Sequence, residues 1–177
     1  MKIKDVIQHM EELAPLAYAE SYDNVGLLVG NKNTVLTGIL ITHDTLEEVV
    51  DEAIATKCNL IMSFHPIVFS GIKKFNGQDY VNKVIVKAIK NDIAIYATHT
   101  ALDNVQNGVN STICDKLNLI NRKTLIPKSD FIYKLTTYTP AVNTERVREA
   151  LFAAGAGNIG NYDECSFNIS GKGTYKG

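Results

Sequence analysis

The chain has 177 residues, 45% of them hydrophobic and 21% charged, which is enough for one ordinary core with at most a small second domain. Its 18 basic and 19 acidic residues leave a net charge of -1, so no overall field would draw it to nucleic acid or to an anionic membrane. No apolar run approaches bilayer length, and the three scattered cysteines form no Cys-x-x-Cys pair, which favours free thiols in a reducing cytoplasm.

The N-terminal segment predicts a helix and then a short strand. Apolar residues recur at helical spacing over residues 3–13 and indicate an amphipathic helix. Further on, Asp23 and Asn24 are typical turn residues, and the apolar run behind them is closed by Gly30. We therefore expect a hairpin-like connection that leads into a short strand.

The next segment predicts a β-α-β unit. Residues 35–42 form an apolar strand pattern, and residues 59–63 form another that is bounded by polar residues. Between them, Thr45 and Glu48 have the spacing of a capping box, which predicts a helix that ends near Lys57. A connection of helix length favours parallel strands with a right-handed crossover.

The pattern then repeats once more. A helix is predicted over residues 80–90, an almost wholly apolar strand over 93–97, and a further helix over 108–117. Residues 1–127 therefore predict an α/β domain with a mainly parallel sheet flanked by helices.

Residues 131–177 differ from this pattern and predict part of a second domain. Residues 131–138 alternate like a strand, 144–154 have helical spacing, and 165–169 again resemble a strand. This β-α-β piece is too small to have a core of its own.

Two of the predicted buried strands deliver a histidine to the same end of the sheet. His65 follows the strand at 59–63, His99 and Asp103 follow the next strand, and Asp44 follows the strand before. Ligands of open α/β sheets bind beyond the carboxyl ends of the strands. Imidazole nitrogen and carboxylate oxygen suit zinc, manganese or iron. Their convergence predicts a site at this edge.

Each of these residues also has an ordinary structural interpretation. His65 could be a core histidine bonded to a backbone carbonyl, and His99 could make a structural hydrogen bond. Asp44 suits a helix N-terminus, and Asp103 suits a loop turn.

Three motifs carry a resemblance to a known family. They are Ser21-Tyr-Asp-Asn-Val-Gly-Leu-Leu-Val-Gly30, Phe64-His-Pro-Ile-Val-Phe69 and His99-Thr-Ala-Leu-Asp103. They resemble the motifs WDNVGL-x-VG, HHPLIF and HTNLD of the GTP cyclohydrolase 1 type 2 homologues, also called the NGG-interacting-factor-three-like family. Residues 134–176 are similar to the ferredoxin-like domain that longer bacterial members insert in mid-chain, so the resemblance covers essentially the whole chain.

The resemblance implies an α/β fold, a ring-shaped homohexamer and a centre of two divalent metal ions. Carried over by position, it assigns His65 and Asp103 as ligands of the same ion. The family's first histidine is replaced by Phe64, which cannot coordinate a metal. The remaining family ligands, a histidine and a glutamate, lie beyond Gly177, so we expect a C-terminally truncated member that holds at most one ion.

His43 is a candidate to replace the lost ligand, because it stands where the family usually has an apolar residue. Strand alternation, however, predicts that its side chain points to the opposite face from its neighbours.

Two kinds of function follow from these observations. The first is a metal-dependent hydrolase of a nucleotide-like or phosphoester substrate, in which His99 moves the proton. The alternative is a non-catalytic metal-binding or regulatory protein, or an inactive fragment. The ligand set separates them, since a hydrolase needs enough ligands together with an open coordination position.

Overall fold

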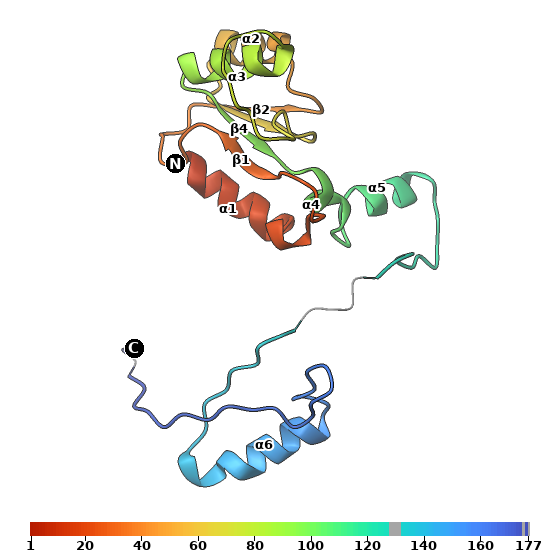
Figure 1. Ribbon diagram of the computed structural model, residues 1–177. Coiled ribbons are helices and arrows are strands. Elements are labelled where there is room, and N and C mark those ends of the chain that lie inside the picture. Colours follow the sequence, from red (N-terminus) through yellow and green to blue (C-terminus); the bar gives the residue numbers. More distant parts are fainter. Residues whose placement is uncertain (128–131, 175, 177) are drawn as a thin grey trace. The chain divides into compact units, whose positions relative to one another are not determined.

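The computed structural model describes residues 1–127, 132–174 and 176, and the chain divides into two compact units, Met1–Arg122 and Lys123–Gly177. The first unit is a four-stranded sheet with helices on both faces (Figure 1). The strands are β1 (Gly26–Val29), β2 (Ile39–Thr42), β3 (Leu60–Ser63) and β4 (Ala94–Ala97). Its helices are α1 (Ile3–Leu13), η1 (Leu16–Tyr18), α2 (Glu47–Ala55), α3 (Tyr80–Lys90), α4 (His99–Asp103) and α5 (Val109–Lys116).

The sheet is mixed and has the strand order β1-β4-β3-β2. β2, β3 and β4 are parallel and are joined through α2 and α3, whereas β1 pairs antiparallel with β4. Every residue of β3 and β4 is buried, as expected for central strands that are covered on both faces. The structure thus confirms an α/β fold.

Two apolar layers hold the sheet between the helices. On one face, α2 and α3 pack against Ile61 and Ile95, and on the other face α1 packs against Leu60, Met62 and Tyr96. Successive residues of β3 therefore point to opposite faces, as the pleat of a strand requires. This packing holds the carboxyl ends of β2, β3 and β4 side by side.

Two local predictions in this unit are wrong. Thr45 does not cap α2, which begins at Glu47 with Leu46 as its N-cap residue. The Thr45 side chain is buried, and its hydroxyl finds no hydrogen-bond partner in the described part of the chain, so it cannot serve the helix start. The segment from His99 to Asp103 is the short helix α4, where we expected a loop.

The second unit contains η2 (Ala141–Asn143) and α6 (Thr144–Ala153), which confirms the predicted helix. Its described residues 132–174 contain no strand beyond a single bridge between Ile159 and Tyr162, so the strands predicted at 131–138 and 165–169 are wrong there. Phe131 lies outside the described residues. A strand needs a hydrogen-bonded partner, and alternation alone supplies none.

None of the helices in the described ranges has the length and apolar character that a membrane crossing requires.

Candidate metal centre

The carboxyl ends of β2 and β3 lie in register at the edge of the sheet. Thr42 is paired with Ser63, and the ladder continues past the strands: the N–H of Phe64 donates to Thr42 O at 3.1 Å. The N–H of His65 likewise donates to His43 O at 3.0 Å. This extension keeps His43 and His65 next to each other although they are far apart in the sequence.

The same hydroxyl contact turns the chain at both strand ends. Thr42 Oγ1 donates to the carbonyl of Asp44, and Ser63 Oγ donates to the carbonyl of His65, each at 2.8 Å. Hydroxyl bonds to a carbonyl two residues along the chain compete with the regular ladder and favour a turn. The two turns direct the side chains that follow each strand toward one another.

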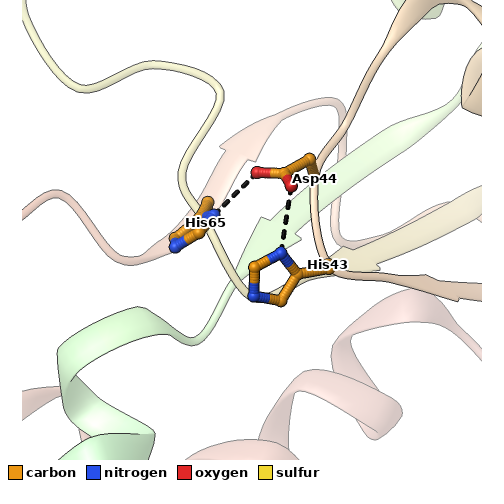
Figure 2. Close-up of side chains that lie close together, drawn as sticks. All are labelled: His43, Asp44 and His65. Atoms are coloured by element: carbon orange, nitrogen blue, oxygen red, sulfur yellow. Dashed lines mark hydrogen bonds and ion pairs between the residues drawn. The ribbon is translucent and has the colours of Figure 1, made fainter.

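The Asp44 carboxylate joins two imidazoles at this edge (Figure 2). Its Oδ1 lies 2.6 Å from His65 Nδ1, and its Oδ2 lies 3.0 Å from His43 Nδ1. The hydrogen bonds from His65 and then His43 hold the pKa of the Asp44 carboxyl below its usual range. All three side chains are accessible to solvent, so a small ligand can reach them.

These three residues could hold a divalent metal ion. One ligand atom from each of His43, Asp44 and His65 lies within 4.8 Å of the other two. Two imidazole nitrogens and a carboxylate oxygen suit zinc, manganese or iron. Three protein ligands leave room for water or substrate in the coordination sphere.

The prediction that His43 points away from its neighbours is wrong. Its ring stacks on Phe64 at a centroid distance of 5.4 Å and meets the His65 ring edge-on at 4.4 Å. The reason is the turn at the end of β2, where Thr42 Oγ1 donates to Asp44 O, because beyond that turn strand alternation no longer decides where the side chain of residue 43 points.

His99 reaches the same edge from the end of β4. Its backbone N–H donates to Phe64 O at 2.9 Å, and its ring lies 5.3 Å from the His65 ring, between centroids. Its Nδ1 lies 2.9 Å from Oδ1 of Asp23, whose side chain is inaccessible to solvent. The sequence showed Asp23 only as a turn residue, within a family motif but with no sign of a partner at His99.

Burial favours the neutral form of the Asp23 carboxyl, but its hydrogen bonds outweigh that effect. Donors from His99, Thr100 and the backbone of Asn24 and Thr100 hold the pKa of Asp23 below its usual range. Asp23 is therefore ionised at neutral pH.

Asp103 is the last residue of α4 and is partly buried. Its carbonyl accepts a hydrogen bond from the Asn110 side chain at 3.0 Å. It does not belong to the group formed by His43, Asp44 and His65, which is the one potential metal-binding cluster within the described residues. The assignment of Asp103 as a ligand of the same ion as His65 stays a prediction.

Comparison with known proteins gives a consistent picture. The family model described as Duf34/NIF3 (NGG1p interacting factor 3) matches residues 1–170. The GTP cyclohydrolase 1 type 2 homolog of Halalkalibacterium halodurans is 41% identical over 172 residues, which are 97% of this chain and 46% of that protein. Its counterpart in Bacillus subtilis is 39% identical over 174 residues, 98% of this chain and 47% of that one.

A solved structure is also similar. The crystal structure of a Bacillus cereus protein related to NIF3 matches with a TM-score of 0.69 and 38% identity, over 99% of this chain and 49% of that one. The chain thus spans about half the length of the curated relatives that it matches.

Proposed function

Because this chain belongs to the Duf34/NIF3 family, we propose that it binds a divalent metal ion at the group formed by His43, Asp44 and His65. The observation that carries the proposal is the convergence of three nitrogen and oxygen ligands, from two paired strand ends, within 4.8 Å. Ion pairs on protein surfaces are common; what supports the proposal is that two imidazoles and a carboxylate, which are donor types that bind zinc, meet at one accessible edge.

We expect one ion per chain. Phe64 occupies the place of a histidine in the family motif, and its ring contacts His43 and His65 but has no atom that can bind a metal ion. Zinc, manganese and iron all fit the donor set. An ion bound here would supply Lewis acidity and lower the pKa of a bound water.

Calorimetric titration with Zn²⁺ and Mn²⁺ tests the proposal. We expect one ion per chain for the wild type and at least about tenfold weaker binding for His43→Ala, since even outer partners of a metal contribute that much. His9→Ala is the matched control, because His9 lies on the exposed face of α1 and its one hydrogen-bond partner among the described residues is Glu12, at 3.4 Å. Equal binding by the His43→Ala and His9→Ala variants would refute the proposed site.

As the reaction class we propose hydrolysis of a phosphoester in a nucleotide-like substrate. Relatives of this chain bear the name GTP cyclohydrolase 1 type 2 homolog. In addition, the His99 ring lies beside the His65 ring, and its Nδ1 contacts the carboxylate of Asp23. A positioned imidazole of this kind can accept a proton from an attacking water.

Turnover of p-nitrophenyl phosphate and bis-p-nitrophenyl phosphate with Mn²⁺ tests this class. We expect His99→Ala to lower turnover by about 10²–10⁴-fold, the usual contribution of a general base. Metal binding without any such turnover would instead favour the non-catalytic alternative.

For assembly and location, we propose a homohexamer in the cytoplasm, with residues 1–127 as the metal-site domain and 131–177 as a separate domain. The edge strand β2 supports self-association, because Ile41 is 81% exposed. Cys58, Cys114 and Cys165 are free thiols, which agrees with a reducing compartment. Light scattering that gives a monomer would contradict the hexamer.

A further inference from the structure

A partly buried carboxylate–imidazole pair, Asp23 and His99, lies beside the proposed metal group without belonging to it. Asp23 comes from the segment before β1, and His99 comes from the end of β4, 76 residues later in the chain. The Asp23 side chain is inaccessible to solvent, and the His99 side chain is only 21% exposed. Tertiary folding therefore brings the pair together and shields its contact of 2.9 Å from water.

Every other contact of the Asp23 carboxylate is with a donor. Oδ2 accepts the N–H of Thr100 at 3.1 Å and the Thr100 hydroxyl, and Oδ1 accepts the N–H of Asn24 at 2.7 Å. A carboxylate held in this way is an acceptor only, so the nitrogen that faces it must carry a proton. The network thus assigns the proton of neutral His99 to Nδ1.

With Nδ1 protonated, Nε2 keeps its lone pair. No described residue makes a hydrogen bond to Nε2, and the ring lies 5.3 Å from the His65 ring and 5.6 Å from the Phe64 ring. The backbone of His99 also has a φ of 29°, a value that is uncommon for residues other than glycine and that the surrounding structure must maintain. The fold therefore holds the imidazole in place at a cost in backbone strain, which is typical of functional positions.

We infer that Asp23 is a positioning residue, which holds His99 in the Nδ1–H tautomer so that Nε2 accepts a proton at the metal group. This inference rests on the proposed function for the source of that proton. As the oxygen of a water molecule bonds to phosphorus, Nε2 takes one proton from that water. The bond from phosphorus to the leaving oxygen breaks on the opposite side, the leaving oxygen takes a proton from solvent, and Nε2 then releases its own proton to solvent. Asp23 stabilises the imidazolium between the two transfers.

The tautomer can be measured without metal or substrate, by long-range ¹H–¹⁵N correlation of the imidazoles in the metal-free chain. In the wild type we expect His99 to be mainly the Nδ1–H tautomer. In Asp23→Asn we expect this tautomer no longer to be the main one. Thr100→Val is the matched control: it removes the hydroxyl contact to Oδ2 but leaves Oδ1 facing His99, so the Nδ1–H tautomer should persist.

A wild-type His99 with its proton on Nε2 would overturn the inference, as would an unchanged tautomer in folded Asp23→Asn. If the Asp23→Asn chain does not fold, the wild-type spectrum alone tests the inference, because it shows which nitrogen of His99 carries the proton. The kinetic counterpart is a fall in kcat of about 10²–10⁴-fold for Asp23→Asn with KM and metal affinity nearly unchanged. A wild-type chain that binds no metal would refute the proposed function, while the tautomer would still test the role of Asp23.

Discussion

The hydroxyl of Ser63 offers a way to disturb the candidate centre without touching any proposed ligand. Ser63 is only 2% exposed, and its Oγ donates to the carbonyl of His65 at 2.8 Å, which fixes the turn from which the imidazole projects. A neutral hydrogen bond contributes about 0.5–1.5 kcal/mol, and loss of this one leaves a partly buried carbonyl with one donor fewer. We therefore expect Ser63→Ala to lower the free energy of unfolding by about 1–1.5 kcal/mol.

The same substitution should weaken metal binding by about tenfold, because His65 loses the contact that orients it. Urea unfolding of the metal-free chain and calorimetric titration with Zn²⁺ measure the two effects separately. Thr37→Val is the control: Thr37 Oγ1 donates to Lys57 O at 2.6 Å before the start of β2, at the opposite end of the strand from the site. If Ser63→Ala loses stability but binds Zn²⁺ as tightly as Thr37→Val, the turn does not position the site.

Three further predictions concern other parts of the unit. Phe64→His should tighten Zn²⁺ binding at least about tenfold in calorimetric titration, because it puts an imidazole in place of the Phe64 ring, whose centroid lies 5.1 Å from that of His65. An unchanged affinity would mean that the ion binds elsewhere. Because folding lowers the pKa of Asp23, its carboxylate stabilises the folded chain above the unfolded pKa of about 3.9, and this stabilisation is lost as the pH falls through the folded pKa. The stability difference between wild type and Asp23→Asn should therefore narrow below about pH 4 in urea unfolding, and a constant difference would contradict this. Gly30→Ala should lower the free energy of unfolding by more than about 2 kcal/mol, because φ at Gly30 is +96° and an added Cβ would lie 2.7 Å from Ala94 Cα. Gly71→Ala is the control: an added Cβ there would have nothing within 4 Å, so the loss measured by urea unfolding should be under about 0.5 kcal/mol. Equal losses for the two variants would refute the packing argument.

Local patterns predicted the bounds of two helices that pack on the sheet. α1 and α3 have the predicted bounds, because each carries an uninterrupted apolar stripe that packs on the sheet. The antiparallel pairing of β1 with β4 was not predicted, since it joins segments about seventy residues apart and no local pattern encodes it. The strands predicted in residues 132–174 failed for the same reason, because alternation does not supply a partner.

The candidate site was predicted in its location and only partly in its members. His65 was a candidate because it lies just beyond the end of a buried strand, one residue after Phe64, and Asp44 because it occupies the same place after the strand before. His43 was misplaced because alternation was extended one residue beyond the end of β2. Asp23 was missed because its partner at His99 is 76 residues away, and only the folded chain shows that pairing.

The position of a bound ion tests the proposed metal site most directly, and anomalous scattering from a crystal of the chain grown with Zn²⁺ would locate it. We expect one peak, with bonding distances of about 2.0–2.2 Å to nitrogen or oxygen atoms of His43, Asp44 and His65. A peak bonded to Asp103 and out of contact with His43 would contradict it and would favour the ligand assignment that the family motif implies.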